Sequence, residues 1–223
     1  VYGVISNYIS DEDKVVGSGL NKEKAIEHAI ENFVLNYCDE RFNKDLSRNI
    51  IASGIGQAES LEKATELAIN NMQENYILDM LKSDDLRLIE IDKKCVEKFC
   101  EKYIVNEFKL YKVNSFDKVI ILCFGKLFDG KLCTSVAVGS NLYEECKRAI
   151  MKLCEVDIKY SNYGSIDSKS VLFNKDISEN IVKIDEKSKA LDLNKVFKKI
   201  HVIDITSEEF KQLNYSVVKC YSE

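Results

Sequence analysis

Proline and tryptophan are absent from the 223 residues of the chain, and three features that would assign a class of protein are also missing. No run approaches the roughly 18 consecutive apolar residues of a membrane-spanning helix, and the N-terminus has no signal-peptide pattern. The net charge of −5 argues against a duplex-binding surface, which needs clustered Lys and Arg. We therefore expect no membrane and no nucleic acid as partner, and a single globular domain of ordinary size.

The eight cysteines form no C-x-x-C pair, and only His28 and His201 could complete a metal site with them. A zinc site is therefore not expected, because zinc ligands follow short, regular spacings. Unpatterned thiols in a chain of this length are typical of a reducing compartment, so we predict a cytoplasmic protein. The chain also begins without Met, which leads us to expect a processed or excised segment.

One short pattern occurs twice. EKAIEHAIEN at 23–32 and EKATELAINN at 62–71 agree at seven of ten positions, at an offset of 39 residues. Each copy follows a glycine-rich stretch on a β-like run and carries alanines four residues apart, which form one narrow stripe on a helix. Small residues there let a helix lie close on a sheet. In a weaker third copy, Ala149 takes the place of Ala29 and Ala68.

The hydrophobic pattern predicts one α/β domain over residues 1–223, with repeated strand–turn–helix units on a mixed sheet. The repeat helices are expected at about 22–41, 60–82 and 141–157. Residues 159–190 are polar and weakly patterned, which predicts a mobile loop. Other strands and short helices are expected at 1–8, 14–19, 49–57, 86–92, 93–103, 105–113, 117–127, 192–199, 201–206, 207–213 and 215–221.

The three helical copies read GSGLNKEKAIEHAIENFVLNY, GIGQAESLEKATELAINNMQENY and VAVGSNLYEECKRAIMKLCE, and the chain closes on IHVIDITSEEFKQLNYSVVKC. In this order, and over nearly its whole length, the chain resembles the YcaO family. The resemblance implies a YcaO-like fold. It also implies use of ATP to activate a backbone amide oxygen of a peptide, which produces azoline rings, thioamides or amidines. Three helices, each after a glycine-containing turn, would carry the nucleotide site.

The resemblance further implies paired carboxylates at i and i+3 on these helices, which hold Mg²⁺ and the nucleotide phosphates. Mg²⁺ needs hard oxygen ligands, and phosphates need a metal or Arg to offset their charge. A leucine cannot coordinate a metal and Lys152 would repel one, although a lysine could pair with phosphate directly. In this chain the pairs are Asn32 and Leu35, Asn71 and Glu74, and Lys152 and Glu155, with Asn36 and Asn75 in the places of Arg, so that only Glu74 and Arg148 match outright.

Two functions follow from these departures. The first is a degenerate YcaO-like accessory or scaffold protein, without a cofactor, in the biosynthesis of a ribosomally made, post-translationally modified peptide such as a bacteriocin. It would bind a precursor peptide or an active partner enzyme, as a homodimer or heterodimer. The second is an active ATP-dependent YcaO enzyme that forms azolines or thioamides with a rearranged site. Glu74, Arg148, Lys152 and Glu155 would then form the residual Mg–ATP pocket, with Glu74 as the metal ligand. An unrelated α/β domain is the third possibility.

Each of these residues also has an ordinary structural interpretation. Glu74 would be a solvated helix carboxylate, which is the commoner role. Arg148 and Glu155 would form a surviving polar pair or lie on a solvated face, and both alternatives stay open. His28 replaces nothing catalytic and is interpreted as a packed or surface residue. The glycines before the helices would cradle a phosphate or, as we favour, only permit tight connections; they are Gly17, Gly19, Gly54 and Gly56.

Overall fold

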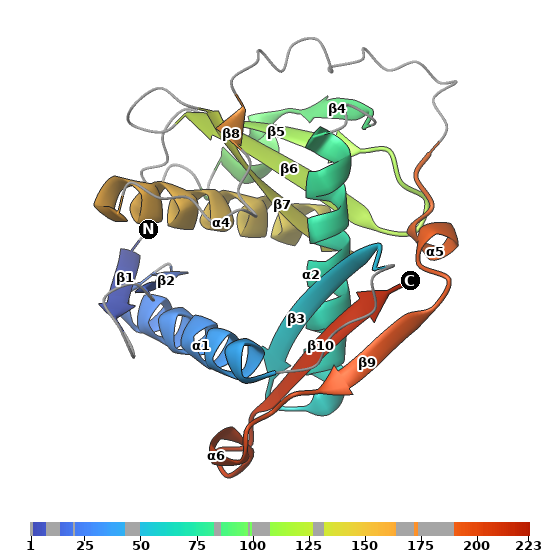
Figure 1. The fold of residues 1–223 in the computed structure, drawn as a ribbon. Helices are drawn as coiled ribbons and strands as arrows, with labels where there is room; N and C mark the ends of the chain where they lie inside the picture. The colour runs from blue at the N-terminus through green and yellow to red at the C-terminus, as the bar shows by residue number, and fades with distance from the viewer. Residues whose placement is uncertain are drawn as a thin grey trace.

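The structure is a computed structural model that describes residues 2–7, 14–19, 21–42, 50–82, 86–97, 99, 108–126, 132–163, 172–173 and 190–223. Figure 1 shows the arrangement of its elements. In chain order they are β1 (Tyr2–Asn7), β2 (Lys14–Gly19), α1 (Lys22–Arg41), β3 (Ala52–Ala58), α2 (Leu61–Lys82), β4 (Leu88–Ile91), the 3₁₀ helix η1 (Lys93–Val96), β5 (Phe108–Val113), β6 (Val119–Lys126), β7 (Leu132–Gly139), α4 (Leu142–Tyr163), β8 (Leu172–Phe173), α5 (Leu193–Val196), β9 (Ile200–Asp204), α6 (Glu208–Lys211) and β10 (Ser216–Ser222).

The strands form three sheets, with the orders β1-β2, β3-β10-β9 and β4-β5-β6-β7-β8. The α/β class and the repeated strand–helix units are confirmed, but the mixed sheet is not, because each ladder between these strands is antiparallel. The strands that precede the long helices do not pair with one another. β2 pairs with β1, β3 with β10 and β7 with β6, so no helix connects two neighbouring parallel strands.

Each long helix begins at the same position of the repeat. Asn21, Ser60 and Asn141 precede the three helices, and the side-chain oxygen of each accepts a hydrogen bond from the backbone N–H three residues later, at 2.8, 3.3 and 3.2 Å. A cap of this kind satisfies one of the N–H groups that the first helical turn leaves free. The repeat thus sets the start of each helix as well as its apolar stripe.

Glycine and alanine bring the first two helices onto their strands. A Cβ atom at Gly17 in β2 would overlap the backbone of Ala29, and one at Gly56 in β3 would overlap the backbone of Ala68. Both alanines are buried. These glycines lie inside strands, so their role is close helix–strand contact instead of a tight connection or a phosphate cradle. The predicted stripe of small residues is confirmed.

The three units close into a ring. Helix α1 packs on β2 and also contacts β3, α2 packs on β3 and contacts β7, and α4 packs on β7 and contacts β2. Figure 1 shows the three helices around the middle of the molecule, with α1 below α4 and α2 beside both. Each helix therefore faces the strand of the next unit at one of three junctions.

Strand β6 has apolar side chains on both faces, and two cores meet there. Ile120 and Leu122 belong to the cluster around α2 and β10, whereas Ile121 and Cys123 belong to the cluster under α4. All four side chains are 0% exposed. Burial of each large side chain contributes about 2 kcal/mol to folding. Cys133 on β7 is buried as well.

The predicted helix boundaries hold for α1 and lie within one residue for α2. Helix α4 runs to Tyr163, six residues past the predicted end, so residues 159–163 are helical instead of part of a loop. The extension follows from Val156 and Tyr160, which continue the apolar contact with the core under α4. Most of the predicted mobile loop, 164–171 and 174–189, lies outside the described residues. No helix in the described ranges has both the length and the apolar character of a membrane span.

Candidate functional site

The first paired position of each helix contacts the strand of its own unit. Asn32, Asn71 and Lys152 align in the repeat, and each contacts the backbone of the strand residue 16 positions earlier. Asn32 Nδ2 donates to Val16 O at 2.7 Å, Asn71 Oδ1 accepts from Ile55 N at 3.1 Å, and Lys152 Nζ donates to Val136 O at 3.3 Å. These groups lie on strand edges that no other described strand covers at that point. The side chains therefore satisfy backbone groups that would otherwise stay open.

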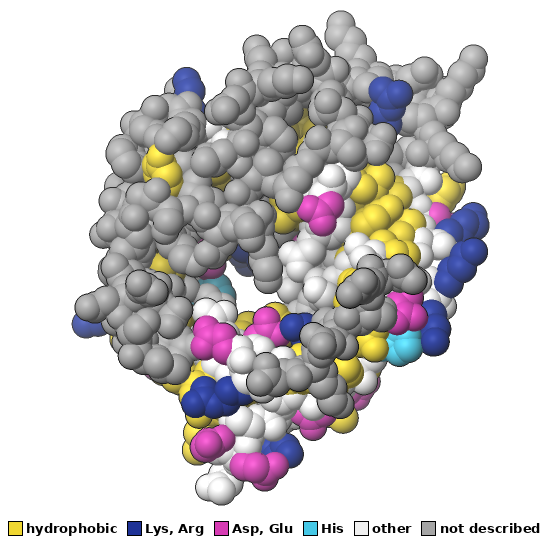
Figure 2. Space-filling model, in the orientation of Figure 1, with side chains coloured by type: hydrophobic (Ala, Val, Ile, Leu, Met, Phe, Trp, Pro, Cys, Tyr) yellow, Lys and Arg dark blue, Asp and Glu magenta, His cyan; other side chains and the backbone are white. Residues whose placement is uncertain are grey.

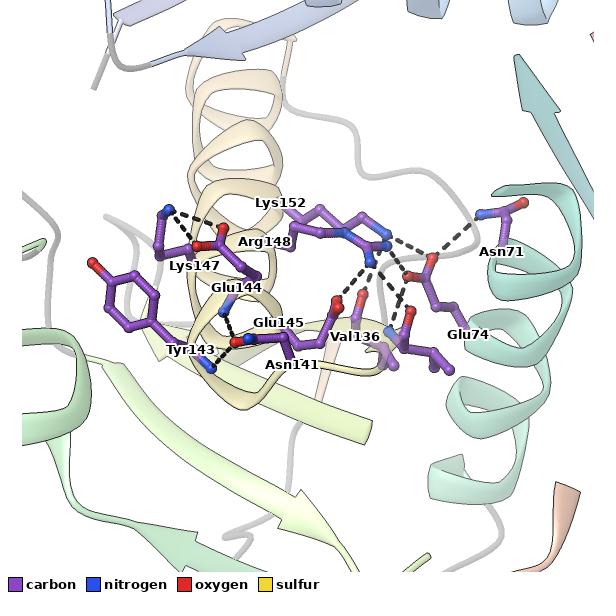
Figure 3. A network of polar contacts seen from close by, with 11 residues as sticks. Asn71, Glu74, Val136, Asn141, Tyr143, Glu144, Glu145, Lys147, Arg148 and Lys152 are labelled. Carbon is purple, nitrogen blue, oxygen red and sulfur yellow. Dashed lines mark hydrogen bonds and ion pairs between the residues drawn. The ribbon is translucent and has the colours of Figure 1, made fainter. Parts of the chain in front are cut away.

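Glu74, at the second paired position of α2, is the centre of the polar network in Figure 3. Its side chain is 5% exposed. Oε1 accepts from Arg148 Nη2 at 2.9 Å and from Val138 N at 3.3 Å, while Oε2 accepts from Lys152 Nζ at 2.6 Å and from Asn71 Nδ2 at 3.5 Å. Both cations come from α4. A buried carboxylate is tolerated when charge and hydrogen bonds replace its water, and this one joins α2 to α4.

Arg148 extends the network along α4. Its Nη1 donates to Glu145 Oε2 at 2.5 Å and to Val138 O at 3.2 Å. Burial raises the pKa of the Glu145 carboxyl, against the opposing charge of Arg148. A Cβ atom at Gly139 would overlap that carboxyl group, so the glycine makes room for it. Two carboxylates and two cations thus balance in charge at the α2–α4 junction.

Glu155, the equivalent carboxylate of α4, joins that helix to α1. Its Oε1 accepts from Ser18 Oγ at 2.5 Å and lies 3.1 Å from His28 Nδ1. Burial lowers the pKa of His28, but the hydrogen bond and the charge of Glu155 outweigh it, so the pKa lies above 6.5. His28 has the position in α1 that Arg148 has in α4, and each contacts the strand residue ten positions earlier.

At the third junction, between α1 and α2, the equivalent positions carry neither a carboxylate nor a basic side chain. Leu35 stands at the carboxylate position, and Leu67 stands at the position of His28. The strand residue that corresponds to Ser18 is Gln57, which is 9% exposed. Its Oε1 has no hydrogen-bond partner in the described ranges. The ring therefore has two junctions where a carboxylate meets a cationic or titratable side chain, and one where the equivalent positions are leucines.

The four predicted site residues all lie in polar contacts between helices, but their pairing differs from the sequence interpretation. Glu74 is buried, not a solvated helix carboxylate. Arg148 bonds Glu74 and Glu145, so a pair of Arg148 with Glu155 is wrong. Seven residues, or about 10 Å of helix, separate those two, and Glu155 points to α1 instead. Sequence reasoning interpreted His28 as a packed or surface residue and missed its contact with Glu155, for which the alignment of His28 with Arg148 in the repeat was the available signal.

No protein-family model matches the chain, and no curated protein matches it either. Among solved structures, the chain is similar to YcaO from Methanopyrus kandleri, whose structure was determined with AMPPCP and Mg²⁺ bound. The TM-score is 0.61 at 9% sequence identity, over 99% of this chain and 84% of that chain. The chain therefore has a YcaO-like fold. At this identity the likeness concerns the fold alone.

The residues at the paired positions do not fit the Mg²⁺ and nucleotide that the resemblance implies. Mg²⁺ requires several oxygen ligands in near-octahedral geometry. Both oxygens of Glu74 already accept from cations and N–H groups, and Lys152 brings a positive charge to the same place. Within the described ranges, no group of three or more His, Cys, Asp or Glu side chains could hold a metal ion. A side-chain cation, Lys152, thus stands where the resemblance implies a metal ligand.

Proposed function

We propose that this chain is a YcaO-like accessory or scaffold protein in the biosynthesis of a ribosomally made, post-translationally modified peptide. It binds a precursor peptide or an active partner enzyme and does not itself turn over ATP. The YcaO-like fold supports the assignment to peptide modification. The observation that carries the non-catalytic part is the double ion pair of Lys152 and Arg148 with Glu74.

The ion pairs oppose metal binding for an energetic reason. Glu74 is 3% exposed, and it has two cations and two N–H donors as neighbours. A metal that took this carboxylate would have to displace Lys152 and leave its ammonium without the partner that offsets its desolvation. Repulsion between the ammonium and a divalent ion would add to this cost. The carboxylate is therefore present, as the resemblance implies, but is already neutralised.

Calorimetric titration of Mg–ATP into the purified chain tests this part of the proposal. We expect no heat of binding, from a protein whose circular dichroism shows α-helix and β-sheet. Thermal unfolding of the same sample in EDTA should give the same midpoint. Binding with a micromolar dissociation constant that Glu74→Ala abolishes would contradict the proposal.

Reconstitution with a partner YcaO enzyme and its precursor peptide tests the accessory role. We expect this chain to raise the rate of peptide modification, and we expect Glu74→Gln to retain most of that effect, because the variant keeps the shape of the side chain. A matched variant of the partner's own metal ligands should abolish ATP hydrolysis. If ATP hydrolysis instead stops with Glu74→Gln while the fold is intact, the chain itself is the ATP-dependent enzyme.

One observation favours that second function. The side chains of Arg148 and Lys152 are 36% and 35% exposed, so both cations can be reached from solvent. Cations of this kind bind phosphate directly. An active enzyme with a rearranged site would use them for the nucleotide and would have Mg–ATP as cofactor. Substrate-dependent ATP hydrolysis that Lys152→Met abolishes would establish it.

A further inference from the structure

Strand β9 forms the outer edge of the three-stranded sheet and shows a regular row of outward backbone groups. Ile205 N donates to Val217 O, so the hydrogen-bonded pairs with β10 fall on every second residue. The N–H and C=O groups of Ile200, Val202 and Asp204 therefore point away from β10. No strand in the described ranges covers this edge.

The strand edges that face the long helices differ from the edge of β9, because their outward backbone groups have hydrogen-bond partners. On β2, β3 and β7 the outward backbone groups are bonded by helix side chains, as at Val16, Ile55 and Val138. On β9 no side chain of the described residues does this. Proteins commonly protect an edge with Lys, Pro or a bulge within the strand. The sequence of β9, IHVID, contains neither Lys nor Pro.

The side chains of β9 suit a strand partner with a particular charge order. Val202, at the centre, is 50% exposed, although it pairs with the buried Cys220 and shares its face of the sheet. Exposed Lys198 and Lys199 precede the strand, and the exposed Asp204 ends it. Figure 2 shows hydrophobic side chains beside basic ones on the side of the molecule where β9 runs. A partner strand that runs antiparallel should therefore be basic at its start, apolar at its centre and acidic at its end.

Strand β9 itself has that order. We propose that β9 pairs antiparallel with β9 of a second copy of this chain, about a two-fold axis at Val202. The two sheets then join into one, the two exposed valines cover each other, and Lys198 lies diagonally opposite Asp204 of the other copy. The outward groups of Ile200, Val202 and Asp204 fall on the hydrogen-bonded pairs of this register. This inference goes beyond the proposed function and does not depend on it.

Sedimentation of the full chain over a range of concentrations measures the association directly. We expect a reversible dimer, and we expect Val202→Lys to raise its dissociation constant by about tenfold or more, because like charges meet at the axis. Leu213→Lys is the matched control, since Leu213 is 63% exposed and lies outside β9. It should leave the dimer unchanged. Circular dichroism of each variant shows whether it is folded.

A second variant keeps the proposal open to contradiction if Val202→Lys fails to fold. Val202→Cys should give a disulfide-linked dimer on mild oxidation, whereas Leu213→Cys and the parent chain should not. A parent chain that stays monomeric at all concentrations, or a dimer that survives Val202→Lys, would overturn the proposal. So would a monomer that instead takes up an extended peptide at β9.

Discussion

The α2–α4 and α4–α1 junctions contain a carboxylate at the same position of the repeat, yet the two are neutralised differently. The side chain of Glu74 is 5% exposed and faces two cationic side chains, Arg148 and Lys152. Glu155 is 19% exposed and faces a hydroxyl and His28, whose charge depends on pH. One junction is thus joined by ion pairs with Arg and Lys, and the other by a carboxylate and a histidine. Equivalent positions of the repeat thus make two different structural contacts.

The largest effect is expected at the ion pairs of Glu74. Lys152→Met removes one of the two cations on Glu74 and should lower the free energy of unfolding by about 3 kcal/mol, because a buried carboxylate loses part of its compensation. Lys147→Met, on the same helix, is the matched control. Lys147 pairs with Glu144, which is 55% exposed, and its loss should cost less than about 1 kcal/mol. Urea unfolding of both variants measures the difference, and equal losses would contradict the comparison.

The α1–α2 junction, where Leu35 and Leu67 have the two positions, provides a second test of the comparison between junctions. Leu35→Glu places a carboxylate at the position of Glu74 and Glu155, on a junction where Leu67 has the repeat position of Arg148, and should cost about 2 kcal/mol. Adding Leu67→Arg supplies the cation that the repeat places opposite and should recover about 1 kcal/mol. Chemical denaturation of the single and double variants completes the cycle. Strictly additive losses would mean that the three junctions are not equivalent in geometry.

The smallest effect is expected at the contact of Glu155 with His28. The pKa of His28 is raised above 6.5 in the folded state. The folded state therefore binds the proton more tightly, so the contribution is complete below pH 6.5 and is lost as the pH rises through the folded-state pKa. His28→Gln should lower stability by about 1 kcal/mol or less at pH 6, since the side chain is partly screened by water, and by less at pH 8.

Thermal unfolding at the two pH values measures this difference. In a Glu155→Gln background, where burial remains and lowers the pKa of His28, the loss caused by His28→Gln should no longer be larger at pH 6 than at pH 8. A loss that is equally large at both pH values in the unaltered chain would mean that His28 acts through packing and not through charge.

Much of the fold could be predicted because it depends on local pattern. The alanine stripe marks both first helices, and the residue three positions before Lys24 or Lys63 caps each one. The pairing of strands could not be predicted in the same way. Strand β3 pairs with β10, which lies at the other end of the chain, and contacts at such separation leave no periodic signal in the residues that form them.

The sequence singled out four residues of the polar contacts between helices, but it did not predict their partners. Glu74, Arg148, Lys152 and Glu155 were singled out by their positions on three helices, but their partners depend on which helix faces which strand. Glu145 was missed because nothing in its sequence surroundings indicates that Gly139 opens a space for it. His28 could have been found by extending the repeat to the third helix, since the alignment of Ala29 with Ala149 also aligns His28 with Arg148.

The ammonium of Lys152 differs from a bound ion in one respect: its presence beside Glu74 does not depend on the concentration of a free species. A ligand stabilises a protein by an amount that depends on how much of it is free, so that its supply and the folded population are linked. Lys152 is covalently part of every copy and lies 2.6 Å from Glu74 in each. On the proposed function, the contact between α2 and α4 would therefore not depend on the supply of magnesium or nucleotide, and the energy state of a cell would not act on it by mass action.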